Sequence, residues 1–415
     1  NIKSMKIVVM KFGGTSVADV KKIKNVAKTV SKQIKSHKVV VVLSAMAGVT
    51  NQLQSFIDEV NSIKNDTILA SRESDLVMTS GEQVTVGLLS MILNQQDIKS
   101  IPLLGWQIPI ITDDGYEKAK ILNIDNKSIN NYFKKYDVIV IAGFQGINLQ
   151  GAITSLGRGG SDTTAVAIAA ALNADRCDIY TDVDGVYTTD PNIDSNAKKI
   201  DKLSYEEMLE LSSTGAKILQ TRSVELAMKN NLTLQVLSSL TNKKGTYVIN
   251  ENELIEKEIV SGVSYSKNES KITISGIPDK PGISAKIFGL MASHNINVDM
   301  IVQNISQDGI NANMTFTTPA KELFYAKKIL EDQSEYLGYS HLSTDSNIAK
   351  ISVVGMGMMS QSGVAEKMFT TLADNKINIL AISTSEIKIS VLIEKKYADL
   401  AIKSLHKVYK LDKTL

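Results

Sequence analysis

Short apolar runs alternate with amphipathic stretches through residues 5–249 of the chain. The runs Lys6–Met10, Lys38–Leu43 and Asp137–Ala142 contain few polar residues, which is typical of strands buried on both faces of a parallel sheet. Between the first two runs, apolar residues recur at helical spacing; they are Val20, Ile23, Val26, Ala27, Val30 and Ile34. Strands that alternate with helices predict an α/β domain with a mostly parallel sheet.

Later segments continue this alternation. Cys177–Thr181 and Leu232–Leu237 are expected to be strands, the second of them closing the sheet. Gly215–Met228 predicts a helix with Lys217 near its start. The alanine-rich stretch after Ser161 predicts another helix, with Ser161 as its N-cap.

Residues 263–340 and 348–415 contain a repeated pattern. Three positions recur 81 residues later: Gly282 as Gly363, Phe288 as Phe369 and Ile296 as Ile377. Each copy has the order strand, helix, strand, strand, helix, strand, which is typical of a ferredoxin-like α+β unit. We expect two such units after the α/β domain, joined to it by a linker at residues 250–262. The C-terminal strand is open to exchange between the two units.

Length and composition narrow the class of protein. A chain of 415 residues is long for one core at about 150 residues per domain. A net charge of +2, with both signs interspersed, gives no indication of binding to nucleic acid or to an anionic membrane. No apolar run reaches the length of a membrane span. The single cysteine, Cys177, and four separated histidines fit neither a disulfide framework nor a zinc site. We expect a cytoplasmic protein, and we leave Asn1–Ser4 out of the interpretation.

The first candidate for chemistry is the loop Gly157-Arg158-Gly159-Gly160-Ser161-Asp162. Its glycines let backbone approach a ligand closely, and the helix that follows begins with free N–H groups that suit an anion. Arg158 offers a bidentate clamp for a carboxylate or phosphate, and Asp162 could position a lysine. The alternative is a glycine-rich turn with an arginine on the surface.

The second candidate is Lys11-Phe12-Gly13-Gly14, between the first predicted strand and helix. It matches neither the Walker pattern nor the dinucleotide fingerprint, because the lysine precedes the glycines. From the strand end, Lys11 could reach a phosphoryl group held by the backbone of Gly13 and Gly14. The alternative is a solvated charge at the end of a strand.

Three further residues are candidates for binding. Glu82 lies in the first turn of a predicted helix, where the helix dipole favours a carboxylate and where it could accept a substrate ammonium. Tyr187, close to Asp182, could hold a purine and ribose, although a tyrosine in the core is an equally good interpretation.

Five motifs in order resemble the aspartate kinase family. They are Lys11-Phe12-Gly13-Gly14-Thr15-Ser16-Val17, Ser44-Ala45-Met46-Ala47-Gly48-Val49-Thr50-Asn51, Thr79-Ser80-Gly81-Glu82, Gly157-Arg158-Gly159-Gly160-Ser161-Asp162 and Thr181-Asp182-Val183-Asp184-Gly185-Val186-Tyr187. The two C-terminal repeats resemble ACT domains. The resemblance implies an amino-acid-kinase domain followed by two ACT units, as in the short, single-activity enzymes.

The resemblance also implies roles for particular residues. Aspartate would be bound by Thr50, Glu82 and Arg158, and Asp162 would orient Lys11, so that Lys11, Asp162 and Lys217 are the expected catalytic residues. ATP would be bound by Lys11, Phe12, Gly13, Gly14, Thr181, Asp182, Tyr187 and Lys217. Mg²⁺ would be held mainly by the ATP phosphates and water, with no protein metal site. The departures from the family pattern are Asn192, Gln220 and Thr221, which affect the nucleotide pocket.

The ACT repeats imply regulation by an amino acid. We expect lysine, alone or together with threonine, to bind the ACT pair at Asp279, Gly282, Ile283, Ser284, Val298 and Gln303, and the ACT units to join chains into a homodimer or a dimer of dimers. Two alternatives stay open. One is an amino-acid kinase for acetylglutamate, glutamate or UMP, and the other is an ACT-based amino-acid sensor with a non-functional kinase domain.

Overall fold

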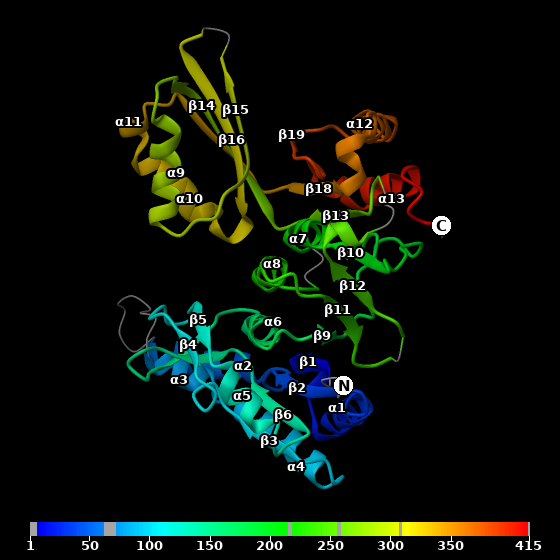
Figure 1. Ribbon diagram of the computed structural model, residues 1–415. Helices are drawn as coiled ribbons and strands as arrows, with labels where there is room; N and C mark the ends of the chain where they lie inside the picture. The colour runs from blue at the N-terminus through cyan, green and yellow to red at the C-terminus, as the bar shows by residue number, and fades with distance from the viewer. Residues whose placement is uncertain are drawn as a thin grey trace. The chain divides into compact units, whose positions relative to one another are not determined.

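The computed structural model describes residues 6–61, 72–214, 218–241, 243–254, 259–306 and 309–413. They form two compact units, whose elements are labelled in Figure 1. The first unit lies within Asn1–Val186, Lys199–Ser212 and Lys217–Ile255. The second lies within Tyr187–Lys198, Ser213–Ala216 and Glu256–Leu415.

The first unit is built on a sheet with the strand order β10-β12-β11-β9-β1-β2-β6-β3. Its strands are β1 (Lys6–Phe12), β2 (His37–Leu43), β3 (Ser100–Leu103), β6 (Val138–Ala142), β9 (Arg176–Thr181), β10 (Lys202–Ser204), β11 (Leu234–Ser238) and β12 (Thr246–Ile249). Neighbouring strands are parallel except β11 and β12, which confirms the predicted fold class. The prediction that Leu232–Leu237 closes the sheet is wrong. The chain returns after β11 as the antiparallel β12, and β10 pairs beyond it.

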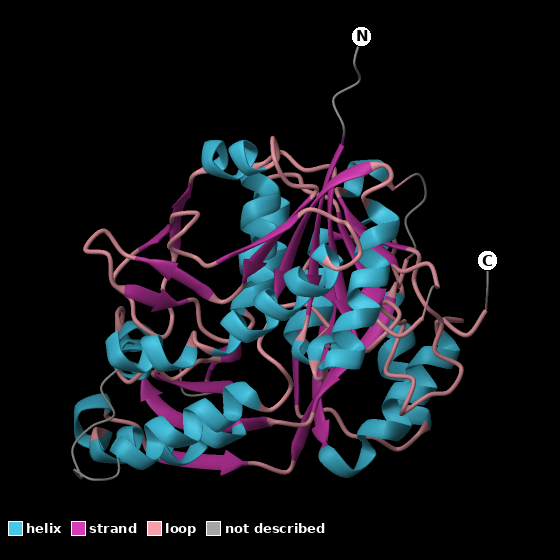
Figure 2. Cartoon of the chain, turned by 90° about the horizontal axis from the view of Figure 1, so that it is seen from below, coloured by secondary structure: helices cyan, strands magenta, loops and turns pink. Residues whose placement is uncertain are grey.

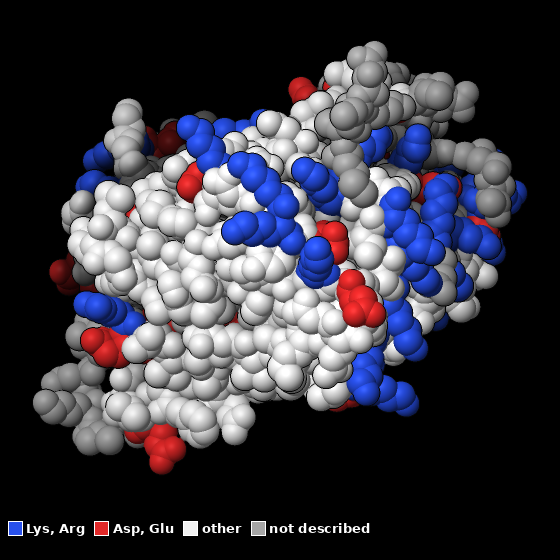
Figure 3. All heavy atoms as spheres, turned by 60° about the horizontal axis from the view of Figure 1, so that its bottom comes forward, with Lys and Arg blue, Asp and Glu red and all other residues white. Residues whose placement is uncertain are grey.

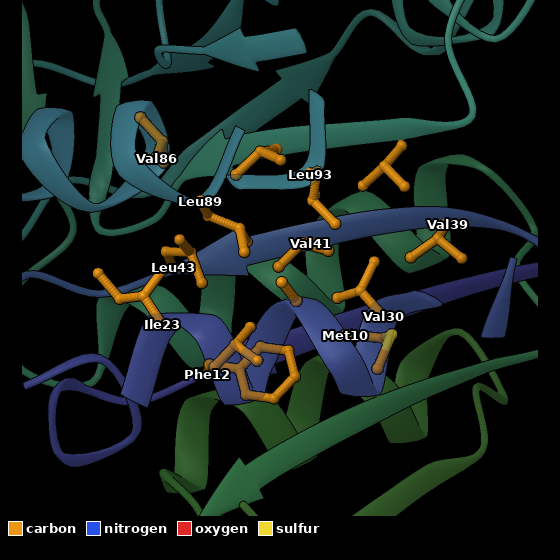
Figure 4. Packing of buried hydrophobic residues seen from close by; sticks show 14 of the residues in the cluster. Met10, Phe12, Ile23, Val30, Val39, Val41, Leu43, Val86, Leu89 and Leu93 are labelled. Atoms are coloured by element: carbon orange, nitrogen blue, oxygen red, sulfur yellow. The ribbon is translucent and has the colours of Figure 1, made fainter. Parts of the chain in front are cut away.

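Helices cover both faces of this sheet (Figure 2). The helices of this part of the chain include α1 (Val20–Gln33), α2 (Val49–Asn61), α4 (Gly81–Asn94), α5 (Asn126–Tyr132), α6 (Gly160–Ala171), α7 (Tyr205–Thr214) and α8 (Thr221–Lys229), of which α1, α4 and α6 contact the sheet directly. Side chains of α1 and α4 pack on β1 and β2 in a core that contains Met10, Phe12, Ile23, Val30, Val39, Val41, Leu43, Val86, Leu89 and Leu93 (Figure 4). Helix α6 contacts β1 and β2 as well, and its first turn therefore lies beside the carboxyl end of β1.

Two predictions about helices in this unit are wrong at their boundaries. Helix α8 begins at Thr221, because Gln220 before it has an extended backbone (ψ 132°); Gly215, Ala216 and Lys217 lie outside the described residues. Helix α6 begins at Gly160 with Gly159 as its N-cap, so Ser161 lies inside the first turn. The left-handed backbone of Gly159 (φ 74°) makes the turn into the helix, a conformation that serine adopts only with strain.

A small sheet with the order β5-β4-β7-β8 lies beside the large one and was not predicted. Its strands are β4 (Ile110–Thr112), β5 (Ile121–Ile124), β7 (Gln145–Ile147) and β8 (Ile153–Ser155). Helix α3 (Arg72–Met78), which contacts β8, was not predicted either. Strands this short contain too few residues for an alternating pattern to be recognised.

By length and composition, one segment of the described chain, Arg72–Asn94, could cross a membrane. It consists of the two helices α3 and α4, and half of its most apolar stretch is buried inside the protein. Because α4 packs on β3 and β6, this segment has the contacts of a core helix.

On the face of the molecule in Figure 3, lysine and arginine side chains gather in the upper middle and on the right, with fewer aspartate and glutamate side chains, and the lower middle is largely uncharged. The net charge of the whole chain is +2.

The second unit contains two ferredoxin-like folds. The first consists of β14 (Glu269–Pro278), α9 (Ile283–Ser293), β15 (Asp299–Ile305), β16 (Asn311–Pro319), α10 (Leu323–Asp332) and β17 (His341–Asp345), with the strand order β15-β16-β14-β17. The second consists of β18 (Ile348–Val354), α12 (Val364–Asp374), β19 (Ala381–Thr384), β20 (Lys388–Glu394) and α13 (Ala398–Val408). Gly282 and Gly363 have left-handed φ values of 93° and 89° as N-caps of α9 and α12, so the repeat extends to backbone conformation.

The fourth strand of the second ferredoxin-like sheet is β13 (Gly262–Ser266), which pairs antiparallel with β18. The predicted first ACT unit, residues 263–340, began with this segment, so that boundary is wrong. The first sheet already has β17 as its outer strand, whereas β18 needs a partner on the side away from β20. The first ACT unit is therefore inserted between two parts of the second.

Candidate functional site

Lys11 lies near the carboxyl end of β1, which pairs with β2 on one side and β9 on the other. Its Nζ lies 2.6 Å from Oδ1 of Asp162 in the first turn of α6, and both side chains are about nine-tenths buried (12% and 10% exposed). Asp162 was predicted to position a lysine, and in the structure its carboxylate contacts Lys11. An ion pair this enclosed holds the ammonium in one place at the end of the sheet.

The two glycines after Phe12 bring backbone close to this lysine. A Cβ on Gly13 would lie 3.3 Å from Lys11 Nζ, and a Cβ on Gly14 would lie 2.9 Å from the carbonyl oxygen of Ala45. Larger residues at these positions would thus crowd the ammonium and the neighbouring loop. The side chain of Phe12 itself is buried and stacks on Tyr180 with the ring centroids 4.4 Å apart, so Phe12 contributes backbone to the site.

Glu82 lies in the first turn of α4 and is 3% exposed. Its Oε1 accepts a hydrogen bond from the Ala45 N–H at 3.1 Å, and its Oε2 has no hydrogen-bond partner among the described residues. Burial raises the pKa of Glu82 to about 7, although the Ala45 N–H opposes the shift. A carboxyl group in this position is ready to accept a cationic group from a ligand.

One pocket of about 840 Å³ in the first unit brings the predicted residues together. Predicted residues in its wall are Lys11, Thr50, Glu82, Arg158, Gly157, Gly159, Gly160, Ser161, Asp162 and Thr181. The pocket therefore has a lysine–aspartate pair, a buried carboxyl group and an arginine in its wall, which suits a small ligand that carries charges of both signs.

Several residues in the pocket wall were missed by sequence reasoning. They include Asn51, Gln54, Ser74, Met78, Glu117, Lys118, Phe144, Ser155 and Gln220. Most come from α2, α3, the β4–β5 connection and β8. Gln220 was noted only as a departure from the family pattern; its side chain fills the space where a Cβ of Gly159 would lie. Asn51 belongs to the second family motif but was given no role. Ser74 and Met78 lie on the unpredicted α3, and Glu117, Lys118 and Ser155 lie in or next to the unpredicted small sheet.

Three residues that were predicted to bind the nucleotide, Thr181, Tyr187 and Lys217, do not all lie in this pocket. Thr181 lines the pocket, and its Oγ1 donates to Oδ1 of the exposed Asp182 at 3.0 Å. Tyr187 begins the segment Tyr187–Lys198, which packs within the second unit. Lys217 lies outside the described residues.

Comparisons with known proteins identify the family. A family model described as "Amino acid kinase family" matches residues 6–238, and one described as "ACT domain" matches residues 272–333 and 351–409. An aspartate kinase of Pseudomonas fluorescens is 49% identical over 98% of this chain and 98% of its own length. The chain belongs to the aspartate kinase family. It is a kinase enzyme with ACT domains.

Solved structures of aspartate kinases have the same fold. Escherichia coli aspartokinase III in complex with aspartate and ADP, described as the R-state, has a TM-score of 0.80 at 26% identity and matches 97% of this chain and 99% of its own. The same enzyme with lysine and aspartate, described as the T-state, has a TM-score of 0.77 at 26% identity, with the same coverage. The fold of an aspartate kinase therefore covers nearly the whole chain.

The residues that were predicted to bind an effector in this aspartate kinase lie in the first ACT unit. Ser284 Oγ, in the first turn of α9, donates to Gln303 Oε1 on β15 at 3.0 Å. Gly282 is the N-cap of α9, and the Asp279 N–H donates to the carbonyl oxygen of Ile310 at 3.0 Å. Ile283 and Val298 pack against the core of this unit. Asp279, Gly282, Ile283 and Ser284 thus lie at or just before the start of α9, where Gln303 of β15 contacts Ser284, whereas Val298 lies just before the start of β15.

Sequence reasoning missed Asp299, at the start of β15. Its Oδ2 lies 2.5 Å from Nζ of the buried Lys350 on β18, and Lys350 holds the pKa of this carboxyl below its usual value against the effect of burial. Among the described residues, no three His, Cys, Asp or Glu side chains gather as a metal site. Cys177 is buried, and burial raises the pKa of its thiol.

Proposed function

We propose that this aspartate kinase transfers the γ-phosphoryl group of ATP to the side-chain carboxylate of L-aspartate, giving 4-phospho-L-aspartate and ADP. This reaction is the first step of lysine, threonine and methionine biosynthesis, and we place the enzyme in the cytoplasm. The observation that carries the proposal is the pocket in which the buried Glu82 faces the same space as the Lys11–Asp162 pair, with one Glu82 oxygen that has no hydrogen-bond partner among the described residues. The aspartate and ADP bound by Escherichia coli aspartokinase III support it.

Glu82 would accept the α-ammonium of aspartate, because a buried carboxyl group gains most from a cationic partner. Arg158 would hold a carboxylate through its planar guanidinium, with Thr50 as a further contact. These three residues line one pocket. They would leave the side-chain carboxylate of the substrate oriented toward Lys11.

ATP would be bound by Lys11, by the backbone of Phe12, Gly13 and Gly14, and by Thr181, Asp182, Tyr187 and Lys217. The nucleophile is already an anion, so no general base is required. An oxygen of the aspartate carboxylate attacks the γ-phosphorus, and the bond to the β-phosphate oxygen breaks with its electrons going to ADP. Two anions must meet, which makes positioning and neutralisation of charge the main tasks of the protein.

Lys11 supplies positive charge at a fixed position, because Asp162 holds its ammonium at 2.6 Å. Mg²⁺, carried by the ATP phosphates and water, would neutralise further phosphate charge. Lys11, Asp162 and Lys217 are the residues that we assign to catalysis.

The ACT units would bind lysine, alone or together with threonine, and lower the activity. The lysine in the T-state structure of Escherichia coli aspartokinase III supports this assignment. Inhibition requires that the effector bind the less active state more tightly than the active one. Pairing of ACT units between chains would give a homodimer or a dimer of dimers.

The test is ADP release from ATP·Mg²⁺ with aspartate, with and without lysine and threonine. ADP that depends on aspartate and decreases with lysine is the expected result. Activity with acetylglutamate, glutamate or UMP in place of aspartate would favour another amino-acid kinase. Binding of lysine without any ADP release would favour an amino-acid sensor.

A further inference from the structure

Two charged side chains outside the predicted motifs hold the base of the loop Gly157–Gly160. Asp75 lies on α3 and Arg222 lies on α8. The two helices are far apart in the sequence, yet both side chains reach the same two backbone segments, residues 117–119 and residues 155–156.

Asp75 is fully buried, and its carboxylate is held by hydrogen-bond donors from both segments. Its Oδ2 accepts from the Ser155 N–H at 2.8 Å, and its Oδ1 accepts from the Ser155 hydroxyl at 2.6 Å. The Glu117 N–H lies 3.1 Å from each of the two oxygens. Hydrogen bonds to a charged acceptor are the strong ones, and loss of this acceptor would leave buried donors without a partner.

Arg222 holds the same two segments through their carbonyl groups. Its Nη1 donates to the carbonyl oxygen of Leu156 at 3.0 Å, and its Nη2 donates to that of Ala119 at 2.9 Å. The rigid fork of a guanidinium fixes two acceptors at once, which the single ammonium of a lysine does with less geometric control.

The glycine loop begins directly after residues 155–156, where Asp75 and Arg222 hold the two backbone segments together. The two segments are also connected by the Ala119 N–H, which donates to the carbonyl oxygen of Ser155 at 2.9 Å. Gly157 follows with a left-handed φ of 76°, and a Cβ there would lie 2.9 Å from the carbonyl oxygen of Glu117. Arg158 is the next residue, and its side chain is exposed in the pocket. The position of Arg158 is thus set by backbone that Asp75 and Arg222 hold from two sides.

We propose that Asp75 and Arg222 are positioning residues for aspartate binding, acting through Arg158. They hold the backbone segment that precedes the glycine loop in one conformation. The guanidinium of Arg158 is therefore already in position to bind the substrate carboxylate. This inference rests on the proposed function, in which Arg158 binds aspartate.

The test compares Asp75→Asn and Arg222→Lys with wild type in steady-state kinetics, varying aspartate and ATP separately. Each variant keeps the size or the charge of the original residue. The KM for aspartate is expected to rise about tenfold or more, because small misplacements of a binding group are costly, while the KM for ATP changes less than about twofold. Glu73→Gln on α3 and Lys229→Met on α8 are matched controls, since both are exposed charges on the same helices, and they should leave both constants unchanged.

A merely structural role would give a different result. It would lower the unfolding temperature and the amount of active enzyme, with the KM for aspartate unchanged, and that outcome would overturn the proposal. An equal rise of both KM values would overturn it as well.

Coupling to Arg158 is tested by repeating both substitutions in an Arg158→Ala background. If Asp75 and Arg222 act through Arg158, they should have little further effect on kcat/KM for aspartate there; full additivity would contradict the mechanism. If turnover is too slow, calorimetric titration with aspartate gives the same comparison. Wild-type enzyme without aspartate-dependent ADP release would refute the proposed function itself, whereas active wild type with unaffected variants would refute only the positioning role.

Discussion

Folding and substrate binding place opposite demands on one buried carboxyl group, that of Glu82. The fold removes it from water and leaves Oε2 without a partner among the described residues, which raises its pKa to about 7. The proposed reaction needs the same group ionised when the substrate ammonium arrives. Native-state stability and substrate binding therefore favour opposite protonation states of Glu82.

The pH dependence of aspartate capture should follow from this conflict. Because kcat/KM reports the free enzyme, its value for aspartate is expected to decrease about tenfold per pH unit below a pKa near that of Glu82, about 7. Rate measurements from about pH 6 to about pH 8 test this. Glu82→Gln should show low activity and no such limb, and a wild-type profile that is flat over this range would contradict the assignment of Glu82.

Glu82→Gln, which should lower the activity, should raise the thermal stability at high pH. A carboxyl group whose pKa rises on folding stabilises the native state below its unfolded pKa of 4.5, and this contribution is lost as the pH rises through about 7. The difference corresponds to at most about 3 kcal/mol. We therefore expect Glu82→Gln to unfold at a higher temperature than wild type at about pH 8, with the gain disappearing toward about pH 5. Thermal unfolding at both pH values measures it, and a less stable variant at the higher pH would contradict the argument.

Lys11→Ala should fold and show almost no turnover. Removing one charged group that stabilises the transition state typically costs about 3 kcal/mol, or about a hundredfold or more in rate. The variant also leaves the carboxylate of Asp162 without its ion pair, so Lys11→Ala/Asp162→Asn serves as the control for folding. Normal aspartate-dependent ADP release by Lys11→Ala would remove this lysine from the mechanism.

At the scale of elements, the start of α6 depends on the fit between two loops. Gly159 has a φ of 74°, and a Cβ there would lie 1.9 Å from Cγ of Gln220, the residue before α8. The glycine loop and the beginning of α8 can approach this closely only because Gly159 has no side chain. The departure from the family pattern at Gln220 thus lies directly against the predicted aspartate loop.

Gly159→Ala is accordingly expected to raise the KM for aspartate at least about tenfold, since backbone near the substrate must move. Gly159→Ala/Gln220→Gly should recover part of the affinity by removing the clash. Gly151→Ala is the matched control, because Gly151 has a similar φ of 77° and no atom of the described residues lies within 4 Å of its Cβ position. If Gly151→Ala weakens aspartate binding as strongly as Gly159→Ala, general backbone strain explains the effect and the loop contact does not.

Sequence patterns predicted the elements that are long and uniformly buried. Strands β1, β2 and β6 were predictable as apolar runs because most of their residues are buried, and α1 was predictable from its helical spacing of apolar residues because one face of it is buried. The glycine turns of the two ACT units were predictable because the same residue recurs in both copies. The structure has the same left-handed backbone conformation at Gly282 and Gly363.

The rest depends on contacts between distant segments. Strands β4, β5, β7 and β8 contain three or four residues each, and they exist because they pair with one another. In the site, the Lys11–Asp162 pair could be predicted from two motifs. Asp75 and Arg222 could not, because apart from the Ser155 hydroxyl they bind backbone groups, and residue identity does not reveal which backbone N–H or carbonyl group a side chain will meet.

At the scale of the whole molecule, the two units do not follow the order of the sequence. Tyr187–Lys198 comes directly after the Thr181–Val186 part of the kinase motif but packs within the second unit. The Val263 N–H of β13 donates to the carbonyl oxygen of Thr188 at 2.7 Å, and Tyr265 Oη donates to Asp190 Oδ2 at 2.9 Å. The buried His406 of α13 contacts both Thr188 Oγ1, at 2.8 Å, and Asp194 Oδ2, at 3.1 Å.

A chain cut after Asn250 would therefore damage the kinase as well as remove the effector site. Such a fragment loses β13 and α13, and with them Val263, Tyr265 and His406, which bind the Thr188 carbonyl, Asp190 Oδ2, and both Thr188 Oγ1 and Asp194 Oδ2. Each buried polar group left without its partner costs about 1–3 kcal/mol. We expect the fragment to unfold at a lower temperature and to lose most of its aspartate-dependent ADP release, so loss of lysine inhibition in it would not by itself locate the effector.

A point substitution separates these effects. His406→Leu in the full chain removes only the contacts to Thr188 and Asp194, and it should shift thermal stability and activity in the same direction as the cut, by a smaller amount. His294→Gln is the matched control, because the ring of this exposed histidine forms hydrogen bonds, among the described residues, only to Ser293 and Leu290 of the preceding helix. A fragment as stable and active as the full chain would mean that Tyr187–Lys198 keeps its conformation without β13 and α13, and the kinase domain would then be independent of its ACT units.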